Sequence, residues 1–114
     1  MHAQKLAEAQ LEVLPELDEY GLLKKADQWN EVLAQWLADQ NHVGLLTPTH
    51  WRFIHALRSY YFKYRIPPAM SLVCKKEGLD THCVQKLFCT CLNAWRVAGL
   101  PDPGEEAKSY LSAM

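Results

Sequence analysis

The sequence lacks the patterns that mark most enzymes, membrane proteins and metalloproteins. It has no phosphate-binding loop and no dinucleotide fingerprint, and its five histidines do not lie near serine or carboxylate at a catalytic spacing. No apolar run approaches the ~20 residues of a membrane span, and no apolar signal-peptide core is present near the first methionine. We therefore expect a cytoplasmic protein that contacts no membrane, holds no cofactor and is not an ordinary enzyme.

The four cysteines are irregularly placed. Structural zinc sites usually take their ligands from two pairs of Cys or His residues, each pair close together in the sequence. Here only Cys89 and Cys91 form a close pair, while Cys74, Cys83 and His82 are scattered. This spacing argues against a metal site. All four cysteines are expected to be reduced in a cytoplasmic protein. Cys89 and Cys91 lie at the start of a predicted helix, where the helix dipole can lower a thiol pKa. They are therefore the candidates for redox or persulfide chemistry, with simple packing as the alternative.

The 114 residues suit one domain, which buries roughly 65% of its unfolded surface. A net charge of −1 hides an uneven distribution. Residues 1–50 carry three Lys/Arg against eight Asp/Glu, a net charge of −5, and residues 51–100 carry eight against two, a net charge of +6. Such asymmetry indicates either a basic face for an anionic partner or two halves that neutralise each other.

One long helix, over residues 48–65, has clear start and stop signals. Thr47 is a good N-cap, and Pro48 is tolerated at the first helical position. Pro67 and Pro68 end the helix. Because its apolar residues recur at three- and four-residue steps, they share a face; that face comprises Trp51, Ile54, Leu57, Tyr61 and Tyr64. We expect other helices to surround this one.

The remaining chain predicts a mainly α fold, a compact helical bundle with a probable small N-terminal β-hairpin. The hairpin would pair Leu11–Leu14 with Gly21–Leu23, and residues 67–88 have the outline of a helix-turn-helix. The other helices are expected over residues 2–12, 28–40 after an Asp27 cap, 69–77 before Gly78, 81–88 after an Asp80 cap, and 91–98 before Gly99. A polar tail follows, in which Tyr110 and Leu111 are candidates to dock.

Three segments, taken in order, resemble the DsrC/TusE family, also called the dissimilatory sulfite reductase gamma-subunit family. The first is DEYGLLKKADQW, residues 18–29. The second is LTPTHWRFIHALRSYYFKYRIPPA, residues 46–69. The third comprises Leu87–Phe88 and then Ala98-Gly99-Leu100-Pro101 with Pro103. The resemblance covers about residues 11–107 and implies an extension over residues 1–10, a family domain over 11–104 and a tail over 105–114.

The resemblance implies a small helical protein with an N-terminal β-hairpin and a helix-turn-helix-like unit. Members of the family hand sulfur between proteins. Some serve sulfite reductase, and others pass persulfide sulfur toward the enzyme that makes 2-thiouridine in tRNA. In the family the sulfur is carried by a cysteine near the C-terminus on a flexible arm, and the sulfite-reductase type has a second cysteine about ten residues upstream.

This chain departs from the family at both cysteine positions. The terminal position falls on Glu106 and the upstream position on Trp95, and the chain continues to Met114. Glutamate cannot hold a persulfide. The resemblance therefore implies a divergent member of sulfur metabolism that acts through protein partners, in sulfur relay or its regulation, without the usual carrier. The first alternative is a sulfur carrier that uses Cys89 or Cys91.

A second alternative is a DNA-binding regulator that uses the helix-turn-helix-like unit. Lysine and arginine contacts to phosphates would supply its salt-dependent affinity, although the second helix offers few side chains to read bases. A third is a haem-type or small-molecule sensor at His50 or His55. The candidate partner-binding residues, for protein or DNA, are Arg58, Lys63, Arg65, Lys75, Lys76 and Lys86. The oligomeric state is left open.

Overall fold

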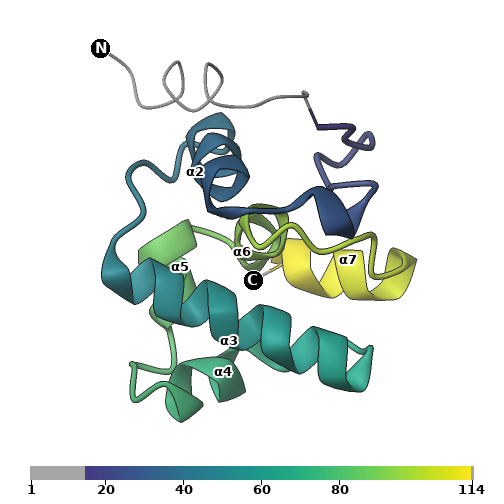
Figure 1. Cartoon of the computed structure of the whole chain (residues 1–114). Helices are drawn as coiled ribbons and strands as arrows, with labels where there is room; N and C mark the ends of the chain where they lie inside the picture. Colours follow the sequence, from purple (N-terminus) through teal and green to yellow (C-terminus); the bar gives the residue numbers. More distant parts are fainter. Residues whose placement is uncertain (1–14, 114) are drawn as a thin grey trace.

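The computed structural model describes residues 15–113, and their fold is mainly helical (Figure 1). Helices α4 and α5 are joined by a short turn, as the helix-turn-helix outline predicts. The elements are η1 (Ala26–Gln28), α2 (Glu31–Gln40), α3 (Pro48–Tyr64), α4 (Met70–Lys76), α5 (Cys83–Phe88), α6 (Cys91–Val97) and α7 (Glu105–Ala113).

Helix α3 begins where the sequence predicts. The Thr47 hydroxyl accepts from the His50 backbone N–H at 3.4 Å, and Thr47 N–H donates to His50 Nδ1 at 3.1 Å. This reciprocal pair is a capping box in which histidine takes the place that glutamate usually has. At the other end Arg65 adopts a left-handed conformation with φ of 60°, and the Pro67–Pro68 pair follows.

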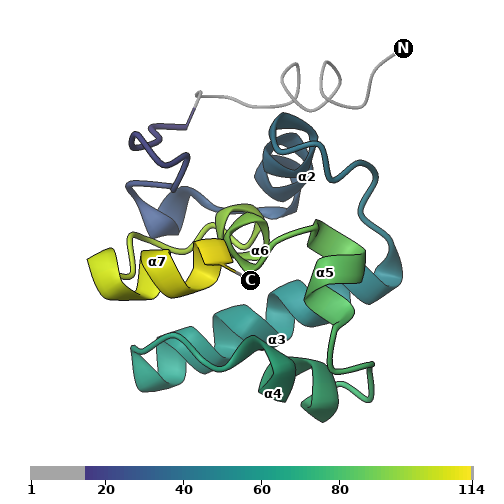
Figure 2. The same cartoon turned by 180° about the vertical axis from the view of Figure 1, so that it is seen from behind.

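The buried face of α3 differs from the predicted one. Phe53, Ile54 and Leu57 are fully buried, whereas Trp51 is only half-buried and Tyr64 is 48% exposed. Figures 1 and 2 show why: the C-terminal end of α3 extends to the edge of the molecule, and α4 lies along only one of its sides. At the end of α3, Phe62 and Tyr64 are therefore exposed, while Tyr61 packs against the core.

Helix α6 is the second central element. It packs against α2, α5 and α7, and in both views it lies between α2 and α3 (Figures 1 and 2). Its buried residues are Cys91, Leu92, Ala94, Trp95 and Val97. The segment that follows α6 is consequently positioned by several elements at once.

Two helix starts differ from the predicted ones. Asn30, not Asp27, caps α2, with its side chain accepting from Leu33 N–H at 2.8 Å. Asp80 accepts from the His82 backbone N–H at 2.7 Å, but α5 begins only at Cys83. Asn30 thus replaces Asp27 as the cap of α2, whereas α5 begins after His82 without a side-chain cap.

The N-terminal β-hairpin is not shown. Among the described residues, an isolated antiparallel bridge joins Leu17 and Leu23. The predicted partner strand Leu11–Leu14 and the predicted helix 2–12 lie outside the described residues.

The prediction that all four cysteines are reduced is wrong for one pair. Cys74 of α4 and Cys83 of α5 form a disulfide, with their Cα atoms 5.9 Å apart. Because the Gly78 turn brings α4 and α5 together, this separation falls in the range that disulfides require. The bridge ties the two helices of the helix-turn-helix-like unit together and removes two of the cysteines considered as zinc ligands.

Within residues 15–113, no helix is both long and apolar enough to cross a bilayer. The cytoplasmic location stays a prediction.

Candidate functional site

The segment from Val97 to Pro101 is held by three side chains from different parts of the chain. The Trp29 indole N–H donates to the Val97 carbonyl at 3.0 Å, and the Trp95 indole N–H donates to the Pro101 carbonyl at 2.8 Å. Arg58 donates to the Ala98 carbonyl at 2.6 Å. Buried carbonyls left without such donors would cost about 1–3 kcal/mol each. Three side chains therefore fix the start of the C-terminal arm, the part of the chain that follows α6.

Gly99 is required in this segment because Trp29 approaches its backbone closely. The residue has a φ of +67°, and a Cβ placed there would lie 2.0 Å from Cδ1 of Trp29. The indole itself is held in place by the Arg58 guanidinium, which lies 3.9 Å from the ring centroid. The added Cβ would also lie 2.6 Å from Cγ and 3.0 Å from Cβ of Trp29.

We predict that Gly99→Ala destabilises the fold by about 2–4 kcal/mol, since it adds an overpacking cost to the left-handed backbone cost. Gly78→Ala is the matched control, because Gly78 has a φ of +71° but a Cβ added there would meet no atom within 4 Å. Urea unfolding gives the loss of unfolding free energy in both variants, and the difference between the two losses is the overpacking cost at Gly99. Equal losses in the two variants would contradict the packing role of Gly99.

Trp95, at the position implied for the upstream family cysteine, is a core residue here. Its side chain is fully buried, and its ring meets Tyr61 edge-on with centroids 5.3 Å apart. Together with the bond to Pro101, these contacts give the position a structural role that needs no thiol.

The segment expected to be a polar tail forms the docked helix α7. Leu111 of α7 is fully buried, as expected of a docking residue, while Tyr110 is 45% exposed. Lys108 is 5% exposed and forms ion pairs with Asp102 at 2.9 Å and Glu105 at 3.1 Å. The Lys108 ammonium also lies 3.6 Å from the centroid of the Tyr20 ring. The arm is therefore anchored at two points of α7, one apolar and one charged.

The charged anchor shifts the ionisation of both partners. Burial alone would lower the pKa of Lys108, but its hydrogen bonds to Asp102 and Glu105 outweigh burial and raise that pKa. The pKa of Asp102 is lowered, first by the hydrogen bond from Gly104 N–H and then by the one from Lys108. At neutral pH both groups are charged and the anchor is complete.

We predict that the contribution of Asp102 to stability is lost in acid. A carboxylate whose pKa is lower in the folded than in the unfolded state stabilises the fold above the unfolded pKa. That contribution disappears as the pH falls below 3.8, the ordinary value for this group, through the lowered folded value. Thermal unfolding of wild type and Asp102→Asn should differ at pH 7 and converge in this acidic range. A constant difference across this range would contradict the role of the anchor.

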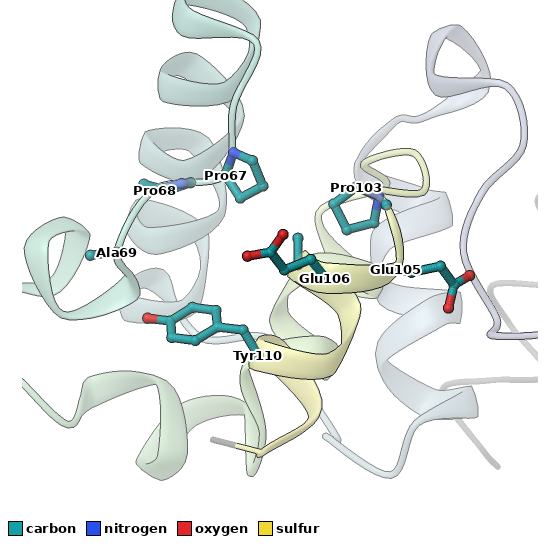
Figure 3. Close-up of a pocket in the computed structure, with 9 residues that line it drawn as sticks. Pro67, Pro68, Ala69, Pro103, Glu105, Glu106 and Tyr110 are labelled. Atoms are coloured by element: carbon teal, nitrogen blue, oxygen red, sulfur yellow. The ribbon is translucent and has the colours of Figure 1, made fainter.

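A groove of about 620 Å³ lies between the start of α7 and the connection from α3 to α4 (Figure 3). Glu106 and Tyr110 reach toward that connection, while Glu105 points to the opposite side of α7. Glu106 is exposed and stands at the position implied for the sulfur-bearing cysteine. The lining residues are Pro67, Pro68, Ala69, Pro103, Gly104, Glu105, Glu106, Ala107 and Tyr110.

The two free cysteines differ in accessibility. Cys91 is fully buried at the start of α6, and burial raises the pKa of its thiol. Cys89 is exposed, with a φ of 71°, directly after α5. Of this pair, only Cys89 is exposed at the surface.

The predicted binding residues do not form one site. The guanidinium of Arg58 is engaged inside the fold, where burial lowers its pKa. Lys86 is paired with Asp80 at 3.2 Å on the exposed side of α5. The exposed residues Lys63, Arg65, Lys75 and Lys76 surround the C-terminal ends of α3 and α4. The ion pair of Lys86 with Asp80 and the shortness of α5 give no support to the DNA-binding alternative.

The histidines considered as sensor ligands already have partners. The Nε2–H of His50 donates to the Leu87 carbonyl at 2.8 Å, while its Nδ1 accepts from Thr47. His55 lies stacked on Trp51, with ring centroids 5.9 Å apart, and its Nε2 is 3.4 Å from Glu31.

Sequence reasoning missed the anchor of α7. Tyr20 and Lys108 are distant in the sequence, and no periodic pattern links them. A Lys that follows acidic residues on a helix usually indicates a solvated face, and only the three-dimensional arrangement shows Lys108 to be buried.

Comparisons with known proteins agree with this geometry. The family model described as "DsrC like protein" matches residues 10–105. The sulfurtransferase TusE of Buchnera aphidicola subsp. Acyrthosiphon pisum is 33% identical over 97 residues, covering 77% of this chain and 84% of the relative. The sulfurtransferase TusE of Escherichia coli K12 is 30% identical over 97 residues, covering 77% and 88%.

Two solved structures share the fold. The oxidized gamma-subunit of the dissimilatory sulfite reductase (DsrC) from Archaeoglobus fulgidus superposes with a TM-score of 0.70 at 31% identity, covering 80% of this chain and 90% of that one. A chain of dissimilatory sulfite reductase I (DsrI) gives a TM-score of 0.72 at 27% identity, with 80% and 89% covered. The fixed Val97–Pro101 segment lies within the matched residues, and the chain belongs to the DsrC-like family.

Proposed function

We propose that this protein takes part in sulfur relay, or in its regulation, by binding the partners of the family without carrying sulfur on its C-terminal arm. The observation that carries the proposal is the groove at Glu106. The side chains of Trp29, Arg58 and Trp95 hold the segment before the groove by hydrogen bonds. The carboxylate of Glu106, however, stands where the family's persulfide is expected.

The docking of α7 supports this reading. A sulfur-carrying arm must leave the body of the protein to reach a partner's cleft. Here Leu111 is fully buried, and removing a buried leucine side chain costs about 2–5 kcal/mol. The ion pairs of Lys108 add to that anchor. We therefore propose that partners meet α7 in its docked position, with Tyr110 and the neighbouring Pro67–Pro68 connection at the contact surface.

This proposal is tested by measuring direct binding of the chain to two purified proteins. One donates persulfide sulfur to a cysteine-bearing relative of this chain, and the other accepts sulfur from that relative. We expect the wild-type chain to bind at least one of them. A Glu106→Lys/Tyr110→Ala variant should bind at least about tenfold more weakly, because an exposed aromatic residue at an interface centre commonly carries this much. Ser109→Ala, on the same exposed helix, is the control and should bind as wild type. Absence of binding to both proteins refutes the proposal.

A second candidate function places the sulfur on Cys89, and the exposure of this thiol favours it. The Cys89 thiolate would attack the outer sulfur of a donor persulfide. The donor's S–S bond breaks as the new S–S bond forms on Cys89, the proton stays on the transferred sulfur, and the donor leaves as a thiolate. No net oxidation occurs. Intact-mass measurements on wild type, Cys89→Ser and Cys91→Ser after mixing with the persulfide donor test this candidate, and an unmodified wild-type protein rules it out.

A further inference from the structure

The exposed end of α3 carries several cation–aromatic pairs. The Lys63 ammonium lies 5.2 Å from the Tyr64 ring centroid, and the Lys76 ammonium lies 5.8 Å from that of Tyr60. The Arg65 guanidinium lies 5.4 Å from the Phe62 ring centroid. Two of these pairs, Lys63–Tyr64 and Lys76–Tyr60, are formed by residues that line the groove between α3 and α4.

The two tyrosines form a platform beside a groove. Their ring centroids are 4.6 Å apart, since positions 60 and 64 lie one turn apart on the same face of α3. A groove of about 340 Å³ runs between them and α4, and Lys63 and Lys76 line it together with Glu77. The Glu77 carboxylate is 3.8 Å from Arg52, so an ion pair offsets the acidic charge in the lining.

We propose that this α3–α4 groove binds single-stranded nucleic acid. Non-specific single-strand sites combine a basic groove for the phosphates with aromatic rings on which bases stack. Both components are present in this groove, where Lys63 and Lys76 lie beside Tyr64 and Tyr60. An acidic peptide would use the cations but would leave the tyrosine platform without a planar partner. A duplex keeps its bases paired and stacked, so it cannot use the rings.

Fluorescence anisotropy with a labelled 12-nucleotide strand, as RNA and as DNA in separate titrations, tests the proposal on the full chain. Binding of either single strand is the expected result, and the stronger of the two identifies the sugar preference. We expect Tyr64→Ala to weaken binding about five- to a hundredfold, the effect of one base–aromatic stack. Tyr64→Phe keeps the ring and should bind within about twofold of wild type, which separates stacking from any general damage.

The two lysines are tested through salt dependence. Each phosphate contact to a single strand contributes a slope of about −0.7 to the plot of log affinity against log salt concentration. Lys63→Ala/Lys76→Ala should therefore make this slope shallower by about 1.4. Lys24→Ala/Lys25→Ala is the charge-matched control from the exposed segment beside η1 and should leave the slope unchanged.

Three outcomes overturn the proposal. The first is no binding of either strand at low salt. The second is equal binding of the corresponding duplex or of a polyglutamate peptide, because either shows attraction to charge alone. The third is equal affinity for wild type and Tyr64→Ala when circular dichroism shows that the variant is folded.

Discussion

Trp95→Ala is expected to lower the free energy of unfolding by about 3–5 kcal/mol, the usual cost of removing a buried tryptophan side chain. Trp95 is fully buried, packs edge-on against Tyr61 and donates to the Pro101 carbonyl. Domains of this size are stable by about 5–15 kcal/mol, so the variant loses a large share of the total. Urea unfolding monitored by circular dichroism measures the loss.

Trp95→Phe separates the contribution of the buried ring from that of the hydrogen bond to the Pro101 carbonyl. Phenylalanine retains much of the buried ring but leaves the Pro101 carbonyl without its donor, which costs about 1–3 kcal/mol. We expect the loss in Trp95→Phe to lie between wild type and Trp95→Ala. A loss below about 1 kcal/mol in Trp95→Ala would contradict the structural role assigned to this position.

Glu106→Cys combined with Leu111→Ala is expected to convert the chain into a sulfur acceptor. The cysteine restores the thiol at the position implied by the family, and loss of Leu111 releases α7 from its apolar anchor. Because that anchor is worth about 2–5 kcal/mol, Glu106→Cys alone should accept sulfur at least about thirtyfold more slowly than the double variant. Intact-mass measurement over time, with the persulfide donor protein of a sulfur relay, gives both rates.

Ser109→Cys with Leu111→Ala is the matched control for this gain of function. It releases the same helix and exposes a thiol one turn further along, at a position that is exposed in the wild type. We expect it to remain unmodified by the donor protein. If both cysteine variants accept sulfur equally, general thiol exposure explains the result and the positional argument fails.

The parts of this fold that are set by local chemistry could be predicted from the sequence. The start of α3 follows from Thr47 and Pro48, and its end follows from Pro67 and Pro68. The family could be predicted as well, because its motifs keep their order. The structure explains why those motif residues occur together: Trp29 and Arg58 bind the backbone around Gly99.

The features that depend on distant contacts could not be predicted. Nothing in the local sequence shows that Cys74 and Cys83 come close enough to form a disulfide, since this depends on how α4 and α5 cross. Periodicity also placed Tyr64 in the core, although α3 extends beyond the body of the molecule at that residue. The buried ammonium of Lys108 in α7 lies over the ring of Tyr20, a residue near the other end of the chain.

A competition measurement tests the central claim most directly. A persulfide donor protein is mixed with the Escherichia coli TusE, with and without excess of this chain, and intact masses of both acceptors are recorded. We predict that TusE gains sulfur more slowly as this chain is added, while this chain gains none. A persulfide on Cys89 of this chain, or loading of TusE at an unchanged rate, would contradict the claim that it binds relay partners without carrying their sulfur.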